Sequence, residues 1–211
     1  MTKNKKIHWL IVLGLVGSLM GWFLVEPVSS DTVDVWANIE EGITCNYSVS
    51  GAETVQFGTL TTGGVTTASP VLQTTTTSNV AFYHKLYDSG DGSTNPGLYS
   101  STGTIDIIGS ADASFSDTAE ITLGNEGYGI QVATTSTGSG NTLIVASRYA
   151  YKTGDNVGGL EQGVGGEIAM ASSSDSLTNR ELNITMKAAV GSGNAGGDYK
   201  DVLTFTCASA M

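Results

Sequence analysis

The two cysteines are the residues of this sequence whose chemistry is easiest to specify. Cys45 and Cys207 lie near the two ends of the segment that follows residue 30, each within an apolar, strand-like stretch. In an oxidising compartment such a pair usually forms a disulfide, and closing so long a loop contributes about 5 kcal/mol in the chain-entropy treatment. The alternative is two buried thiols that never meet. A metal site is not expected, because two thiols and one histidine beyond residue 30, His84, are too few ligands.

An oxygen-rich segment offers a second kind of chemistry, the binding of a hard cation. Residues 88–95 contain the carboxylates of Asp88 and Asp91 and the amide of Asn95 among serines and glycines. Closely spaced carboxylate and carbonyl oxygens can coordinate calcium. The spacing is not that of an EF-hand loop, and Asp and Gly are also ordinary turn residues. We therefore expect a solvated turn, with calcium at Asp88, Asp91 and Asn95 as the alternative and no other cofactor.

Motifs that suggest catalysis fail in their structural context. Residues 191–196 match the G-x-G-x-x-G spacing, but a strand-like segment follows them where a phosphate site needs a helix N-terminus. We interpret them as a hairpin loop. His84 shares a face with Phe82 in an alternating segment, which predicts a surface or partly buried strand residue rather than a catalytic base. The sequence predicts no enzyme, although paired carboxylates of the glycosidase type, which meet only in space, stay open.

The elements that must position these residues are strands. After residue 31, apolar and polar residues alternate with a period of two, and Gly-rich turns separate the alternating segments. This pattern predicts an all-β sandwich or barrel. The threonine-rich residues 59–77 are predicted to form an exposed strand face, with an O-glycosylated stretch as the alternative, and residues 172–179 are predicted to form a loop. The expected strands are 33–39, 43–49, 80–87, 104–108, 120–123, 128–134, 142–146, 182–190 and 202–208.

The N-terminus has the parts of an export signal. Three lysines within the first six residues precede an uncharged apolar run over residues 7–25, which a Glu-Pro pair ends. The 19 residues of that run could also just span a bilayer as an apolar helix. Residues 1–30 are therefore predicted to be a signal peptide cleaved after Ser30 or a retained membrane anchor. In both cases the rest of the chain is extracytoplasmic, and it contacts the membrane only through residues 7–25 if they are uncleaved.

The remainder of the chain is acidic. Of 20 acidic and 9 basic residues, one acidic residue and three lysines lie within residues 1–30, so residues 31–211 carry 19 acidic and 6 basic residues and a net charge of −13. This balance disfavours nucleic acid and anionic lipid as partners. A segment of about 180 residues can bury one good core, so residues 31–211 are predicted to form a single domain.

Two stretches add a resemblance to known families. Residues 196–206, Gly-Gly-Asp-Tyr-Lys-Asp-Val-Leu-Thr-Phe-Thr, resemble the closing strand of secreted bacterial β-sandwich proteins, among them spore coat protein U-like and pilin-like subunits. Residues 55–61, followed by a threonine-rich and then an aromatic strand, are similar to small surface proteins of candidate-phylum bacteria. The resemblance implies an immunoglobulin-like antiparallel β-sandwich at the cell surface, with a structural or adhesive role and no catalytic residues.

These observations lead to three hypotheses of different classes. The first is an exported, cell-surface or secreted structural or adhesive protein, whose partners are other surface proteins or further copies of itself. The second is a pilin-like fibre subunit, in which residues 32–39 add a strand to the sheet edge of a neighbour. The third is a secreted carbohydrate-binding module or hydrolase. A fold alone does not decide among them.

Overall fold

The structure is a computed structural model that describes residues 42–50, 54–88, 96–100, 107–111, 118–150, 154–160 and 168–210. The chain divides into two units, Met1–Ile39 and Glu40–Met211, and the second is described below. The predicted leader over residues 1–30 and the predicted strand over residues 33–39 lie outside the described residues. Within the described ranges, no helix has the length and apolar character needed to cross a membrane.

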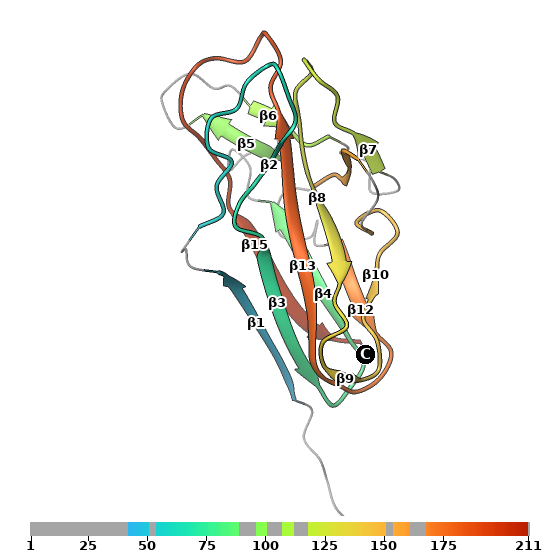
Figure 1. Cartoon of the computed structure of the whole chain (residues 1–211). Helices are drawn as coiled ribbons and strands as arrows, with labels where there is room; N and C mark the ends of the chain where they lie inside the picture. The colour runs from blue at the N-terminus through green and yellow to red at the C-terminus, as the bar shows by residue number, and fades with distance from the viewer. Residues whose placement is uncertain are drawn as a thin grey trace, which may run out of the picture. The chain divides into compact units, whose positions relative to one another are not determined.

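Strands make up the regular structure of the described ranges, which are all-β as predicted (Figure 1). In chain order the strands are β1 (Ile43–Val49), β2 (Thr66–Thr67), β3 (Leu72–Ser78), β4 (Phe82–Asp88), β5 (Gly97–Ser100), β6 (Ile107–Gly109), β7 (Thr118–Glu120), β8 (Gly127–Thr134), β9 (Ser139–Gly140), β10 (Ile144–Val145), β11 (Asn156–Gly158), β12 (Ile168–Ser173), β13 (Leu177–Ala189), β14 (Tyr199–Lys200) and β15 (Leu203–Ser209).

The strands form three sheets. The largest has the order β1-β3-β13-β8-β11-β7, with β2 and β9 also paired to β13, and the second has the order β10-β12-β4-β15. A small third sheet contains β14, β5 and β6. Pairings between these strands are antiparallel. In the view of Figure 1, β3, β13 and β8 lie in front of β4, β12 and β15, so the two larger sheets form two layers.

One hydrophobic core is shared by the two larger sheets. Ile130 and Leu182 come from the largest sheet and Phe82 and Met170 from the second, and all four are fully buried in the same cluster. Each such side chain contributes about 1.5–3 kcal/mol by leaving water. Two antiparallel sheets around a common core agree with the β-sandwich that the sequence predicts.

The period of two locates several strands closely, but it misses β12, and the predicted strand over residues 120–123 overlaps β7 only at Glu120. The predicted strand over residues 43–49 has the bounds of β1, and those over 128–134 and 202–208 differ from β8 and β15 by one residue. However, β12 ends at Ser173 and β13 begins at Leu177, so the predicted loop over residues 172–179 is wrong at both ends. The register of β13 against β3 shifts between Leu177 and Arg180. This irregularity breaks the alternation on which the prediction rested.

The threonine-rich strand is a second correction. The predicted exposed face is confirmed at Gln73 and Thr77 but is wrong for the other face of β3, where Leu72, Thr74, Thr76 and Ser78 are buried. The reason is position, because β3 lies between β1 and β13 and turns one face to the core. Branched threonine side chains pack well on such a pleated surface when their hydroxyls find partners.

Candidate functional site

A disulfide joins the two larger sheets. Cys45 on β1 and Cys207 on β15 are bonded, with their Cα atoms 6.5 Å apart, which confirms the predicted pairing. Within the described residues, β1 ends the order of the largest sheet and β15 ends that of the second. The bond therefore ties the edge strand of one layer to the edge strand of the other, across a sequence separation of 162 residues.

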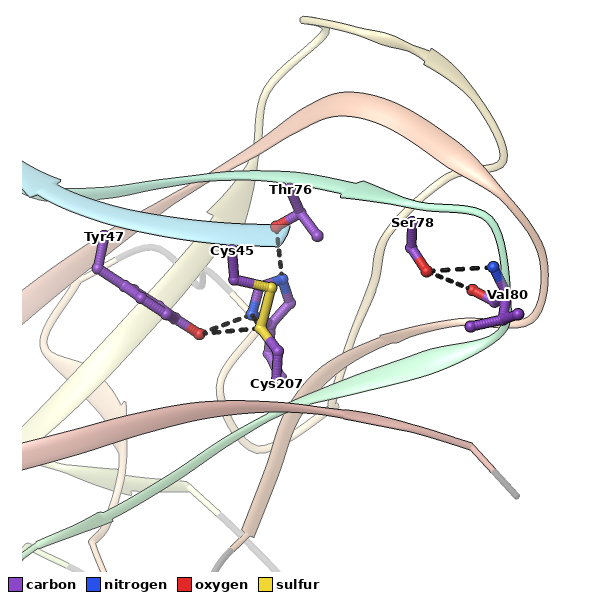
Figure 2. Close-up of a disulfide and its surroundings, with 7 residues drawn as sticks. Cys45, Tyr47, Thr76, Ser78, Val80 and Cys207 are labelled. Carbon is purple, nitrogen blue, oxygen red and sulfur yellow. Dashed lines mark hydrogen bonds between the residues drawn. A yellow bond between two sulfur atoms is a disulfide. The ribbon is translucent and has the colours of Figure 1, made fainter. Parts of the chain in front are cut away.

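A buried histidine lies beside this disulfide. His84 on β4 is fully buried, beyond the surface or partly buried place that the sequence predicts. Its Nδ1 shares a hydrogen bond with the Tyr47 hydroxyl at 2.8 Å and lies 3.3 Å from the Cys207 sulfur. Its Nε2 shares a hydrogen bond with Thr76 Oγ1 at 2.9 Å. Figure 2 shows the Tyr47 hydroxyl directed toward the disulfide, and the Thr76 hydroxyl directed toward a ring nitrogen beside it.

The strand register explains why these groups meet. His84 is paired with Cys207 across the β4–β15 ladder, and Cys45 is paired with Thr76 across the β1–β3 ladder. Side chains two residues apart share a face of a strand, so Tyr47 follows Cys45 on the inner face of β1. The cluster thus draws one or two side chains from each of four strands, which come from both layers.

Burial sets the charge of this cluster. Desolvation lowers the pKa of His84 from 6.5 to about 4, and it raises the pKa of Tyr47 above its usual value of 10.0. Both side chains are therefore neutral at neutral pH. A neutral imidazole keeps one ring nitrogen as a donor and the other as an acceptor, which suits the hydroxyls of Tyr47 and Thr76 on its two sides.

The same cluster contains a set of ligand-type atoms that sequence reasoning missed. The sulfurs of Cys45 and Cys207 and a ring nitrogen of His84 all lie within 4.8 Å of one another. The sequence predicts no metal site, because two thiols and one histidine beyond residue 30 are few ligands for one ion. The alternation in each segment indicated which residues point inward, but it could not show that β1, β4 and β15 converge at one level.

The structure describes only part of the predicted calcium loop. Asp88 is fully buried at the end of β4, whereas Asp91 and Asn95 lie outside the described residues. Calcium at these three residues therefore stays a prediction. The structure places Asp88 near Tyr128, whose pKa is raised well above 10.0. Burial is the main cause, and the negative charges of Asp201 and Asp88 and a hydrogen bond to Asp201 add to it.

A hollow of about 1120 Å³ opens at the ends of β1 and β15 that lie away from the disulfide. Most of its lining comes from two segments, residues 54–62 and residues 190–203, the second of which includes β14 and the start of β15, and buried apolar side chains form its floor. The floor side chains are Leu72, Leu98, Tyr128 and Met186. Ligand sites are typically concave, largely apolar and about 300–1,000 Å³ in volume, so this hollow is slightly larger than a typical site and shares its apolar character.

The glycine-rich residues 191–196 form part of that wall. They do not form the predicted hairpin, because β13 before them belongs to the largest sheet and β14 after them pairs with β5 in the third. They are instead a connection between sheets. The strand β14, and not a helix, follows them, so these residues lack the helix N-terminus on which that kind of phosphate site depends.

Comparison with protein-family models and with curated proteins found no match to this chain. Two features of the structure bear on its function: the cluster of the disulfide, His84, Tyr47 and Thr76 toward one end of β1 and β15, and the hollow at their other end.

Proposed function

We propose that this protein is exported and acts outside the cytoplasm as a non-catalytic structural or adhesive protein built on an immunoglobulin-like sandwich. The disulfide between Cys45 and Cys207 supports export, because such bonds persist in oxidising compartments. The charged and then apolar N-terminus over residues 1–30 supports it independently.

The hollow is the observation that carries the binding role. It lies between the loop that follows β1 and the segment that leads into β15, and Val49 and Leu203 at the ends of those strands line it. The disulfide holds the same two strands together farther along their length. A concave surface held by a covalent bond loses little conformational freedom when it binds a partner, which favours affinity.

The hollow also favours a second candidate, the fibre subunit. Edge strands present backbone groups to which a further extended segment can add, and both β1 and β15 end their sheets among the described residues. Residues 32–39 have the alternation of a strand, with Val33, Val35 and two further apolar residues on one face. In this candidate, that segment of one copy lies in the hollow of the next and covers its apolar floor.

Export is tested by thiol labelling. The full chain with its own N-terminus is produced in a bacterial host, fractionated, and alkylated without reductant before its intact mass is measured. We expect an extracytoplasmic protein with both cysteines unmodified, and the mass reports whether residues 1–30 are removed. A cytoplasmic protein with two alkylated cysteines would overturn the proposal.

Assembly is tested by size-exclusion chromatography and electron microscopy of the exported protein. We expect concentration-dependent oligomers that are weakened by Val35→Lys and retained by Asn38→Lys, because Asn38 belongs to the opposite face of the alternation. A monodisperse monomer at high concentration would exclude the fibre subunit and leave adhesion to another surface protein. A specific signal on a glycan array would favour a carbohydrate-binding module instead.

A further inference from the structure

We propose that Cys45, Cys207 and His84 form a binding site for a thiophilic d¹⁰ metal ion, Zn²⁺ or Cu⁺, when the disulfide is reduced. The disulfide and the ion are then alternative occupants of one place in the sandwich. Thiolates and imidazoles are the ligands that these ions prefer, and the three ligand atoms already lie within 4.8 Å of one another.

The distances fit a shared ion. Two atoms that each bind one zinc at about 2.3 Å are at most about 4.6 Å apart. The Cys207 sulfur is 3.3 Å from Nδ1 of His84, so these two ligands need little movement. The two sulfurs, bonded at 2.00 Å in the oxidised protein, must separate, which rotation of the cysteine side chains allows.

The backbone positions of the ligands do not depend on the disulfide alone. The β4–β15 ladder runs from the pair Asp88–Leu203 to the pair Phe82–Ser209 and includes His84 opposite Cys207. Cys45 is held by the β1–β3 ladder, in which every residue of β1 has a partner. Reduction removes one covalent link and leaves both ladders in place, and the core that the two sheets share keeps Cys45 opposite His84 and Cys207.

The surroundings match those of a metal-bound histidine. A ligating imidazole usually donates its other ring N–H to an oxygen, which orients the ring. With its proton on Nε2, His84 donates to Thr76 Oγ1 at 2.9 Å, while its Nδ1 accepts from the Tyr47 hydroxyl and lies 3.3 Å from the Cys207 sulfur. An ion bound at Nδ1 replaces that hydrogen bond from Tyr47. The Tyr47 oxygen, 2.8 Å from Nδ1 and 3.6 Å from the Cys207 sulfur, is placed to complete the coordination or to donate to a thiolate.

The chemistry balances with an external thiol or phosphine reductant. The S–S bond accepts two electrons and two protons to give two thiols, while a dithiol is oxidised to its disulfide or a phosphine and water to the phosphine oxide. Binding of the ion then forms two metal–sulfur bonds and one metal–nitrogen bond, and it releases the two thiol protons to solvent. Reoxidation requires that the ion leave first, so bound metal protects the thiols.

The test uses the full chain in mild detergent, reduced with a phosphine, with Co²⁺ as the spectroscopic probe. We expect one Co²⁺ per chain, with thiolate-to-cobalt charge transfer and the d–d bands of a tetrahedral site, and displacement by Zn²⁺ or Cu⁺. The ion that displaces at the lower concentration identifies the preferred occupant. The oxidised protein should give none of these bands, and failure of both ions to displace Co²⁺ would overturn the proposal.

Matched variants on β3 separate a metal site from a merely reduced pair of cysteines. Thr76→Val removes the hydrogen bond to His84 and should weaken binding by about 10–100-fold, whereas Thr77→Val, at an exposed position on the same strand, should leave it unchanged. His84→Gln should weaken binding more than Thr76→Val does. Equal affinity of the reduced wild type and His84→Gln would overturn the assignment.

A second readout avoids dependence on how well a variant folds. Zn²⁺ should protect both thiols of the reduced wild type from alkylation, as measured by intact mass. Circular dichroism should show a folded chain when metal is present, whether or not the reduced chain is folded without it. Rapid alkylation of both thiols in the presence of metal, or a reduced chain that stays unfolded with metal, would refute the site.

Discussion

The strands β1 and β15 pass through two regions of opposite character. At one level they enclose Cys45, Cys207 and the fully buried His84, with hydroxyl partners on both ring nitrogens. At the other end, Val49 of β1 and Leu203 of β15 line a hollow of about 1120 Å³. We call the first the sealed level, because its half-buried disulfide joins the two strands beside the fully buried His84, and the second the open level.

The contrast shows how a sandwich can keep an open surface without losing its edges. Edge strands tend to separate or to pair with other chains unless something holds or covers them. Here the disulfide holds the edge strands β1 and β15 together at one level. Between the disulfide and the hollow, the rings of Tyr47 on β1 and Phe205 on β15 pack together with their centroids 5.1 Å apart. The hollow can then remain open while the strands that border it are fixed.

The largest expected effect on stability comes from removing the disulfide between Cys45 and Cys207. Cys45→Ser with Cys207→Ser should lower the free energy of unfolding by about 5 kcal/mol, because a loop of that length is no longer closed in the unfolded chain. Urea denaturation of the oxidised wild type and of the double variant measures the difference. Added reductant should destabilise the wild type and leave the variant unaffected. A loss below about 1 kcal/mol would show that packing alone seals this level.

Two positions on β13 compare the sealed and open levels directly. Leu182 is fully buried, whereas Met186, four residues along the same face, lines the hollow. Leu182→Ala should cost about 3–5 kcal/mol, because it leaves a closed cavity. Met186→Ala should cost about 2 kcal/mol, since its lost atoms border an existing opening. Thermal or urea unfolding measures both, and equal losses would contradict the distinction between the two levels.

Acid should act on the sealed level through His84. Its pKa is about 4 in the folded protein, against 6.5 for an ordinary histidine. Below pH 6.5 the unfolded chain takes up a proton that the folded protein refuses, so stability falls as the pH drops and stops falling near pH 4. The pKa difference corresponds to about 3 kcal/mol.

His84→Gln is the control for this pH dependence, because it removes the titrating group and keeps a hydrogen-bonding side chain. The free energy of unfolding is measured for both oxidised proteins between pH 8 and pH 3.5. The wild-type curve should fall more steeply than the variant curve between pH 6.5 and pH 4. Parallel curves would show that carboxylates elsewhere carry the acid sensitivity and that burial of His84 does not.

Much of the fold could be predicted, because its signals are local. Alternation places Leu203, Phe205 and Cys207 on one face of a strand, and the structure turns that face to the core or the disulfide. The disulfide could be predicted because the sequence contains two cysteines, so Cys207 is the one cysteine of the sequence with which Cys45 can pair. The irregular start of β13 could not, because a register shift near Asn179, whose φ is 52°, leaves no periodic trace.

The site was harder to predict because it is made by pairing across the sandwich. His84 and Cys207 are 123 residues apart, and their neighbourhood depends on β15 lying next to β4. Thr76 looked exposed because a run of threonines suggests a polar face, whereas its environment is decided by its strand lying between β1 and β13. The hollow left no signal, since it arises where loops of two sheets diverge.

The smallest effect on stability is expected at the rim of the hollow. Val202 is 54% exposed and lines the hollow, whereas Ile144 is 61% exposed and does not. Because both side chains already meet solvent, Val202→Asp and Ile144→Asp should each change the free energy of unfolding by no more than about 0.5 kcal/mol.

The two variants should nevertheless differ in association. An aspartate at residue 202 places a charge against any apolar segment in the hollow, so self-association should weaken by about tenfold, or about 1.4 kcal/mol. Ile144→Asp should associate like the wild type in analytical ultracentrifugation, since its side chain lies apart from the hollow. Equal weakening in both variants would mean that net charge governs association. Equal association in all three proteins would show that the open level is not where copies meet, and the contrast between sealed and open ends would then concern stability alone.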